Sequence, residues 1–346
     1  MAKIAANTYV ADRGWTLRSI VLDKVEAKKS DVRLETVMRG QPASVEIERV
    51  EQSGGQLVVT PAPFAYMSDW TLHVGGKSYT RKDVTDERIE GLDAFEAINE
   101  NGVVYRIYRP KSTTPRPLIL FLHGGGECGT DNVMQMVGTV GAMRLAELYP
   151  DMYVMAPQAP PRPAGEGLPP MNREFKSIVM SGEHGWNRTY LGKVCDAIRG
   201  MIASGEVDPH RVYVTGLSMG GYGTINAMSV GADLFAAAAP ICPTMTPDSF
   251  EILRGLVHAK IWVSTAYVDH TVYRHKYITD AIMELRDKGN RDARLTIYSP
   301  EELAAYGIGT DPDLPLRELF AENHSSWILT YHNEHGILSW LTEQVK

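Results

Sequence analysis

The sequence predicts an α/β domain, built on a mainly parallel sheet with helices on both faces, preceded by a small all-β sandwich domain. Three observations predict this architecture. The chain of 346 residues is long for a single hydrophobic core. Short alternating segments separated by turns fill its first part, and strand-like segments alternate with helix-like ones in the rest. We therefore expect two domains, at residues 1–91 and 92–346.

The all-β domain is predicted by short segments with apolar side chains at every second position. Turns rich in Gly, Ser or Pro separate these segments, which is the pattern of strands in a sandwich. The expected strands are residues 17–25, 32–38, 44–50, 56–60 and 70–74. Such a module can bind a carbohydrate or another protein, but a packing domain with no ligand of its own is the favoured expectation, since fold does not determine function.

The α/β domain is predicted by the alternation of strands and helices in residues 92–346. The expected strands are residues 103–108, 118–122, 152–156, 212–215, 261–265 and 295–298. The expected helices are residues 136–149, 191–203, 224–228, 275–288 and 333–345. Residues 118–122 are all apolar, which is typical of a strand buried on both faces. Residues 157–190 and 299–323 are irregular, and we expect both segments at the sheet edge where ligands bind in α/β proteins.

The composition argues against some partners. The chain carries 35 Lys and Arg against 42 Asp and Glu, a formal charge of −7, so we expect neither nucleic acid nor a membrane as a partner. No stretch approaches the ~20 apolar residues that span a bilayer, and charges interrupt the amino-terminal segment, so we expect a soluble protein with no signal peptide in this chain. The compartment stays open, because the chain is also compatible with the mature form of an exported protein. The oligomeric state stays open as well.

Ser218 is the candidate nucleophile. It lies between β-branched residues typical of a strand and a run typical of a helix, so we expect a strand, a sharp turn and a helix with Ser218 at the apex. Strained backbone at such a turn lifts the hydroxyl clear of the sheet, and the residues two before and two after must be small. Gly216 and Gly220 meet this requirement. The Gly-x-Ser-x-Gly pattern is weak alone and gains weight from its partners.

An acid and a base follow in the order that a serine acyl-transfer site of this topology needs. Asp269 follows the expected strand 261–265, although a turn or helix-cap aspartate is the alternative interpretation. His324 follows the last expected strand, and a neutral imidazole can accept the serine proton near pH 7. His270 and His275 come too early for this order, although both can line the site.

Glycines after the buried strand predict donors for an oxyanion. Residues 123–127 read His-Gly-Gly-Gly-Glu, and glycines let backbone N–H groups approach a substrate carbonyl closely. One donor from this loop would act together with the N–H of Met219, the residue after the nucleophile. A phosphate-binding loop is the alternative, but the segment lacks both the Gly-Lys-Ser/Thr ending and the Gly-x-Gly-x-x-Gly pattern.

Four aromatic residues near these motifs are candidates for a substrate pocket: Trp186, Tyr222, Tyr267 and Trp327. Core packing is the commoner role for any one of them. We expect no metal and no cofactor, since the chain has neither His-Glu-x-x-His nor a paired Cys-x-x-Cys, and His332 and His335 lack a third ligand nearby in the sequence. The three cysteines are expected as free thiols.

The motifs together resemble those of a known group of enzymes. Residues 121–127, residues 216–223, the Asp269-x-x-Val272 segment and the His324-x-x-Trp327 segment resemble the α/β-hydrolase esterases related to polyhydroxybutyrate depolymerases and feruloyl (cinnamoyl) esterases. The Ser-Met-Gly-Gly motif is also similar to that of S-formylglutathione hydrolases. The resemblance covers about residues 92–346. Some members of the group carry an immunoglobulin-like domain ahead of the hydrolase domain, so the resemblance implies one at residues 1–91.

The resemblance also implies roles for individual residues. It implies Ser218 as nucleophile, Asp269 and His324 as its partners, and Met219 with Gly125 or Gly126 as oxyanion donors. The chain departs from the group at two places. Relatives commonly have Arg at the position of Cys128, and many have a shorter segment than residues 299–323. Both departures concern substrate specificity rather than the triad.

The sequence therefore favours a cofactor-free serine carboxylesterase acting through an acyl-enzyme. The expected substrate carries a short or aromatic acyl group, such as acetyl or feruloyl, on a sugar or a simple alcohol. A serine peptidase of the same fold is the first alternative, because esters and peptides need the same oxyanion chemistry; the sequence shows no propeller-like repeats before the catalytic segment, which favours esters. A catalytically silent hydrolase scaffold that binds a glycan or a protein partner is the second alternative.

Overall fold

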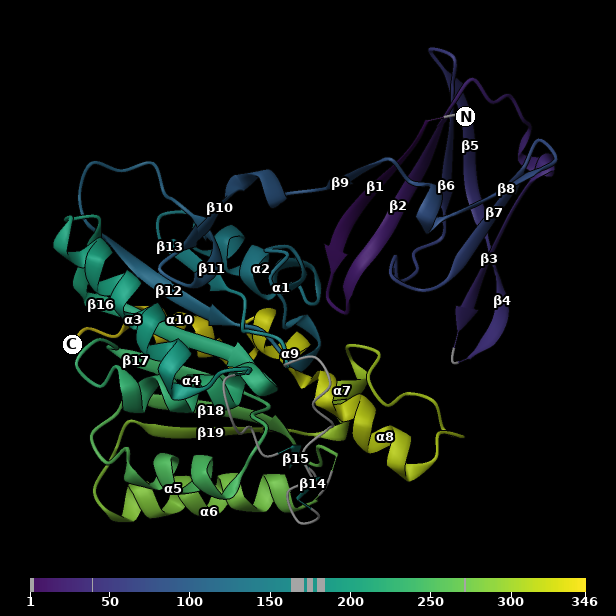
Figure 1. Cartoon of the computed structure of the whole chain (residues 1–346). Coiled ribbons are helices and arrows are strands. Elements are labelled where there is room, and N and C mark those ends of the chain that lie inside the picture. Colours follow the sequence, from purple (N-terminus) through teal and green to yellow (C-terminus); the bar gives the residue numbers. More distant parts are fainter. Residues whose placement is uncertain (1–2, 39, 163–170, 173–176, 179–183, 271) are drawn as a thin grey trace. The chain divides into compact units, whose positions relative to one another are not determined.

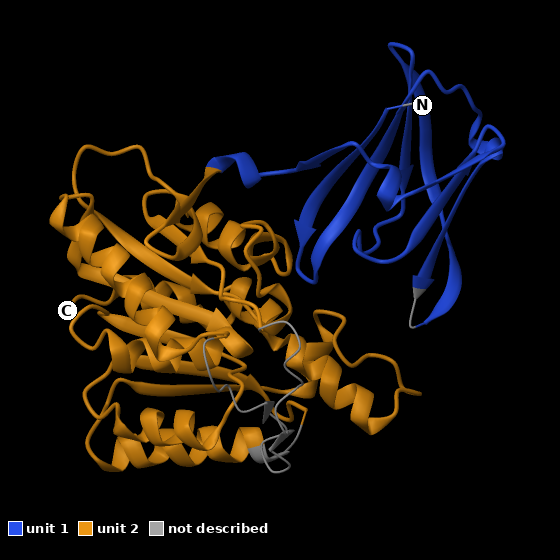
Figure 2. Ribbon diagram, viewed as in Figure 1, with its two compact units in different colours: residues 1–94 blue, residues 95–346 orange. Residues whose placement is uncertain are grey.

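The structure is a computed structural model that describes residues 3–38, 40–162, 171–172, 177–178, 184–270 and 272–346. The chain divides into two compact units, Met1–Ala94 and Phe95–Lys346 (Figure 2). Each unit has its own cluster of buried hydrophobic residues. The first unit is all-β and the second is a mainly parallel sheet flanked by helices, so the predicted fold class is confirmed.

The first unit consists of two sheets that share one hydrophobic cluster. One sheet has the strand order β5-β6-β2-β1-β9 and the other has the order β4-β3-β7-β8. Neighbouring strands are antiparallel except β1 and β9. The strands are β1 (Ile4–Ala11), β2 (Gly14–Asp23), β3 (Val32–Met38), β4 (Gln41–Val45), β5 (Ile47–Ser53), β6 (Gln56–Pro61), β7 (Trp70–Val74), β8 (Lys77–Thr80) and β9 (Asp86–Ile89). Alternate side chains of β7 are buried, which explains why the sequence predicts this strand.

One prediction for this unit is wrong: residues 44–50 do not form a single strand. The chain changes sheets there, because β4 pairs with β3 whereas β5 pairs with β6 in the other sheet. The sequence gives no turn signal at this crossing. The sequence analysis also missed β1, β8 and β9, and the last two are short and mostly exposed, so they lack a hydrophobic pattern.

The second unit is built on an eight-stranded sheet with the order β10-β11-β13-β12-β16-β17-β18-β19 (Figure 1). Strands β10, β11 and β13 pair antiparallel, and every pair from β13 to β19 is parallel. The strands are β10 (Phe95–Glu100), β11 (Val103–Tyr108), β12 (Arg116–Leu122), β13 (Tyr153–Pro157), β16 (Val207–Leu217), β17 (Ala237–Ile241), β18 (Ile261–Ala266) and β19 (Ala293–Tyr298). A separate short pair consists of β14 (Met171–Asn172) and β15 (Ser177–Ile178).

Helices cover both faces of this sheet (Figure 1). Helices α3, α4, α5 and α6 pack in sequence against one another, whereas α1, α2, α9 and α10 form a second group. The helices are α1 (Met134–Val137), α2 (Gly141–Leu148), α3 (Arg188–Ala203), α4 (Met219–Val230), α5 (Pro247–Gly255), α6 (Val272–Asp287), α7 (Pro300–Ala304), α8 (Leu316–Glu322), α9 (Trp327–Tyr331) and α10 (Ile337–Glu343). The 3₁₀ turns are η1 (Lys29–Asp31), η2 (Arg81–Asp83), η3 (Leu92–Ala94), η4 (Gly125–Glu127), η5 (Asn323–Ser326) and η6 (Glu334–Gly336).

Several expectations for the second unit differ from the structure in detail. Residues 136–149 form two helices, α1 and α2, and the expected final helix at 333–345 begins only at Ile337. Asn333 and His335 have positive φ angles of 64° and 58°, which prevents the helix from starting earlier. The irregular segment 299–323 contains α7 and α8. Half of the other irregular segment, 157–190, lies outside the described residues.

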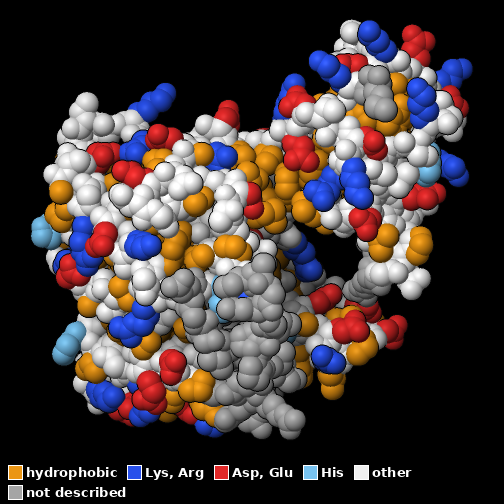
Figure 3. Space-filling model, in the orientation of Figure 1, with side chains coloured by type: hydrophobic (Ala, Val, Ile, Leu, Met, Phe, Trp, Pro, Cys, Tyr) orange, Lys and Arg blue, Asp and Glu red, His pale blue; other side chains and the backbone are white. Residues whose placement is uncertain are grey.

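Charged side chains of both signs are interspersed over both units on the face seen in Figure 3. The formal charge of −7 is therefore not gathered into one patch on that face. Within the described part of the chain, no helix is both long and apolar enough to cross a membrane. All three cysteines are free.

Candidate active site

Ser218 lies on the turn between β16 and α4. Its backbone angles are φ 58° and ψ −117°, a strained conformation for a residue with a Cβ atom. A Cβ atom added to Gly216 would lie 2.4 Å from the carbonyl oxygen of Leu122, and one added to Gly220 would lie 1.8 Å from that oxygen. Both positions therefore need glycine, because the elbow lies directly against the end of β12.

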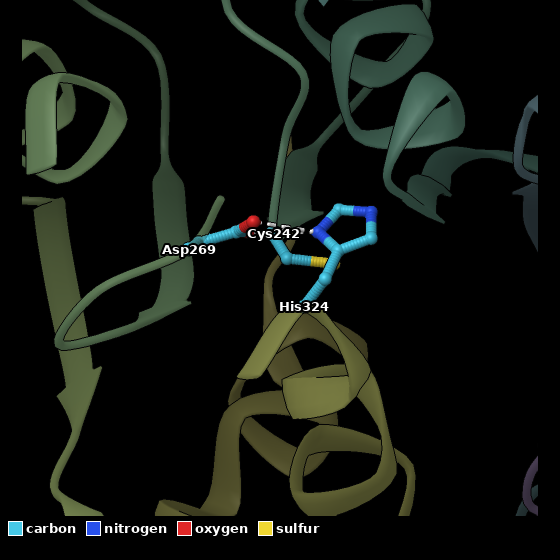
Figure 4. A group of neighbouring side chains, drawn as sticks. All are labelled: Cys242, Asp269 and His324. Carbon is cyan, nitrogen blue, oxygen red and sulfur yellow. Dashed lines mark hydrogen bonds and ion pairs between the residues drawn. The ribbon is translucent and has the colours of Figure 1, made fainter. Parts of the chain in front are cut away.

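Ser218, His324 and Asp269 form one chain of hydrogen bonds. His324 Nε2 lies 2.7 Å from Ser218 Oγ, and His324 Nδ1 lies 2.9 and 2.8 Å from the two carboxylate oxygens of Asp269. The three residues come from the β16–α4 turn, the segment after β18 and the turn η5. Figure 4 shows His324 and Asp269 pointing toward each other. The proton that Nδ1 donates to Asp269 leaves Nε2 free to accept the serine proton.

Asp269 is a buried carboxylate with three basic neighbours. Its side chain is 1% exposed, and burial alone would raise its pKa. The charge and hydrogen bond of His324, with the charges of Arg274 and His270, outweigh burial, so the pKa of Asp269 lies below its ordinary value. Arg274 Nη1 lies 3.3 Å from Asp269 Oδ1 and is itself buried. Asp269 is therefore ionised and able to stabilise an imidazolium at His324.

The glycine loop after β12 is held by His123. The ring of His123 is fully buried, its Nε2 accepts the N–H of Ala159 at 2.9 Å, and its Nδ1 lies 2.6 Å from the carbonyl oxygen of Gly124. The indole N–H of Trp186 donates to the His123 carbonyl oxygen at 2.9 Å. These bonds fix the backbone just before the predicted oxyanion donors.

The two candidate glycines of this loop differ in their surroundings. A Cβ atom on Gly125 would lie 3.9 Å from Met219 Cβ, whereas one on Gly126 would meet nothing within 4 Å. Met219 is the first residue of α4, so its N–H has no acceptor within the helix. Gly125 is therefore the candidate that lies beside Met219.

The predicted pocket residues differ in burial. Trp186 has no exposed surface, its ring centroid lies 4.8 Å from that of His123, and a Cβ atom on Gly223 would come within 2.6 Å of it. Tyr222 is 7% exposed and belongs to the same hydrophobic cluster as Trp186. Trp327 is half-buried and places its ring edge-on to His324, at 5.6 Å between centroids and 88° between planes. Trp327 is thus the one of these three whose ring lies against a triad residue in the described part of the chain.

Two residues beside the triad were missed in the sequence analysis. Arg274 pairs with Asp269 from the first turn of α6, and Cys242 lies fully buried after β17. The thiol of Cys242 and the ligand atoms of Asp269 and His324 lie within 4.8 Å of one another (Figure 4). Burial raises the pKa of Cys242 far above its usual range, so the thiol stays neutral. The Asp269 and His324 atoms in this group are already bonded to each other, which accounts for the cluster without a metal.

The strand order, the helices on both faces and the serine elbow after β16 define the α/β-hydrolase fold, and comparisons with known proteins agree with it. A model of the prolyl oligopeptidase family matches residues 173–283. The chain is similar to a crystal structure of a thermostable esterase, with a TM-score of 0.66 and 24% identity over 99% of this chain and 100% of that chain.

Two S-formylglutathione hydrolases are also similar in structure. The one from Agrobacterium tumefaciens is 16% identical, with a TM-score of 0.46 over 73% of this chain and 95% of that chain. The one from Staphylococcus aureus is 14% identical, with a TM-score of 0.43 over 68% of this chain and 96% of that chain. No relative of the chain was found among curated proteins. The resemblance to polyhydroxybutyrate depolymerases and feruloyl esterases, and the immunoglobulin-like nature of the first unit, stay predictions.

Proposed function

We propose that the protein is a serine esterase that hydrolyses carboxylic esters through an acyl-enzyme at Ser218. The observation that carries the proposal is the 2.7 Å contact between His324 Nε2 and Ser218 Oγ, with Asp269 bonded to the other ring nitrogen. A hydroxyl, an imidazole and a buried carboxylate in this order activate a serine for attack on a carbonyl carbon.

Acylation begins when Ser218 Oγ attacks the ester carbonyl carbon and its proton passes to His324 Nε2. Negative charge then develops on the carbonyl oxygen, and the N–H groups of Met219 and Gly125 donate to it. The N-terminal end of α4 adds a favourable dipole at this point. When the tetrahedral intermediate collapses, the bond to the alcohol oxygen breaks and that oxygen takes the proton from Nε2.

Deacylation uses the same groups with water in place of the serine. Nε2 of His324 takes a proton from water as the water oxygen attacks the acyl carbon, and Ser218 leaves as the proton returns to it. The products are a carboxylic acid and free enzyme. This cycle needs no cofactor and no metal, and the substrate we propose is a short or aromatic acyl ester of a sugar or a simple alcohol.

Of the two comparisons that bear on the substrate class, one favours an ester and the other favours a peptide. The likeness that spans the whole chain is to a protein described as an esterase, whereas the matching family model, over residues 173–283, is that of a peptidase family. The second candidate function is therefore a serine peptidase using the same triad. The rates of an aryl ester and the matching anilide separate the two, and faster cleavage of the anilide would favour the peptidase.

The variant Ser218→Ala tests the proposal. Hydrolysis of an aryl acetate is expected to fall by about 10⁴-fold or more, because the nucleophile is lost. The matched control is Ser229→Ala in the same helix, which is expected to keep full activity. Labelling with a fluorophosphonate should modify the wild-type protein at Ser218. Unchanged turnover in Ser218→Ala would refute the proposal, and a folded wild-type protein that never labels would favour a silent binding scaffold.

A further inference from the structure

His270 connects the acid and the base of the triad through its backbone. It follows Asp269 directly and has φ 52°, a left-handed conformation that is rare for a residue with a side chain. Its N–H donates to the carbonyl oxygen of Phe320 at 2.9 Å. Phe320 belongs to α8, which runs directly into the turn η5 that carries His324. Strain of this kind persists where the surrounding structure fixes it, and it is common at active sites.

The side chain of His270 lies against the base itself. The ring centroids of His270 and His324 are 4.7 Å apart, with 49° between the ring planes. Apart from Ser218, four neighbours of the His324 ring fall into two groups. Asp269 and Cys242 are buried, whereas His270 and Trp327 are half-buried. Of these four neighbours, the partly exposed pair is the one that a substrate can reach.

The position of the base fixes where the alcohol part of an ester must lie. Nε2 of His324 donates a proton to the alcohol oxygen as the acyl bond breaks, so this oxygen has to come within hydrogen-bond distance of Nε2. The rest of the alcohol then extends beside the partly exposed neighbours of the ring. An imidazole offers both a hydrogen-bond donor and an acceptor, and an indole offers an apolar surface.

We infer that His270 is a specificity residue for the leaving alcohol, and that it favours alcohols carrying further hydroxyl groups over plain alkyl alcohols. The inference rests on the proposed function and concerns acylation, the step in which the alcohol is still bound. Deacylation starts from the same acyl-enzyme whichever alcohol has left, so a contact with the alcohol does not change its rate.

Two variants remove the imidazole while keeping the backbone. Asn and Gly tolerate a left-handed conformation, so His270→Asn and His270→Gly are expected to fold. The control is His258→Asn, which makes the same change at an exposed residue. His258 lies just before the start of β18, at the opposite end of the strand from Asp269 and His270. Thermal unfolding of all three variants verifies that the fold is retained.

Glycerol monoacetate and n-propyl acetate are suitable probes, since they share the acyl group and the carbon chain and differ in two hydroxyl groups. The ratio of kcat/KM for the glycerol ester to that for the propyl ester is expected to fall about three- to tenfold in both His270 variants, the effect of about one hydrogen bond. The ratio should stay unchanged in His258→Asn. The steady-state rate after the burst with an aryl acetate, which reports deacylation, should stay within about twofold of wild type.

An unchanged ratio of the two kcat/KM values would overturn the inference, whether both esters keep their rates or lose them equally. If deacylation is also slower while the ratio is unchanged, His270 acts only by positioning His324. Persistent cleavage of both esters by Ser218→Ala would instead refute the proposed function itself.

Discussion

The variant Gly220→Ala tests how closely the elbow is packed against the sheet. The new Cβ atom would lie 1.8 Å from the carbonyl oxygen of Leu122 and 2.7 Å from that of His123. Ordinary contact begins at 3.4 Å, so the start of α4 must withdraw from the end of β12 by about 1.6 Å. Both obstacles are backbone atoms, and no side-chain rotation can relieve them.

This displacement moves the reacting groups. Ser218 and Met219 are carried by the start of α4, whereas the glycine loop continues from β12, so the nucleophile and the Met219 donor move away from the Gly125 donor. A misplacement of about 1 Å can cost about 10²-fold in rate. We therefore expect kcat/KM for an aryl acetate to fall at least about 100-fold, and the free energy of unfolding to fall by about 1–3 kcal/mol from overpacking.

Gly126→Ala is the matched control in the facing loop. A Cβ atom there meets nothing within 4 Å, and the backbone is not left-handed. Activity should be unchanged, and stability should be equal or higher by about 0.4–1 kcal/mol because the unfolded chain loses freedom. Aryl acetate hydrolysis and urea unfolding measure both variants. Gly220→Ala with near wild-type kcat/KM, or Gly126→Ala with as large a loss, would refute the steric reasoning.

Three further outcomes are expected. Asp269→Asn should lower kcat for an aryl ester by about 10³–10⁴-fold with little change in KM, since an amide no longer fixes the tautomer of His324; an unaltered kcat would contradict this. Burial raises the pKa of the Cys242 thiol, and raises the pKa of the Cys195 thiol to about 11. The stability that the two neutral thiols confer is therefore fully present below the ordinary thiol pKa of 9.0 and is lost as the pH rises above that value. Urea unfolding between pH 7 and 10.5 should show this decline, and equal stability throughout would count against it. Trp186→Ala should lower the free energy of unfolding by about 3–5 kcal/mol because the indole is fully buried, and a loss below about 1 kcal/mol would show that the site collapses around the smaller side chain.

The sequence predicts the parts of the site that depend on the order of residues along the chain and on local steric requirements. Ser218 needs small residues at fixed offsets, and Asp269 and His324 follow the ends of strands that have clear apolar patterns. The structure brings these three side chains together at hydrogen-bond distances. Their catalytic roles stay a proposal until they are tested by substitution.

Other parts of the site depend on packing that no local pattern encodes. Arg274 is a residue type expected on the surface, and its burial follows from pairing with Asp269. Cys242 follows β17, whose Ala-rich sequence has little intrinsic preference for a strand. The aromatic candidates could not be ranked from the sequence, because the burial of Trp186 and the exposure of Trp327 are set by neighbours distant in the chain.

The buried pair of Asp269 and Arg274 has a consequence for the electrical balance of the reaction. Arg274 neutralises the carboxylate in the resting enzyme, so the two charges cancel over 3.3 Å. During acylation a positive imidazolium at His324 and a negative oxyanion form together, and they cancel in the same way. These charges therefore sum to zero at each stage, and buried pairs are screened only weakly by dissolved ions. Hydrolysis of an uncharged ester at this site should accordingly proceed at nearly the same rate in dilute buffer and in concentrated salt.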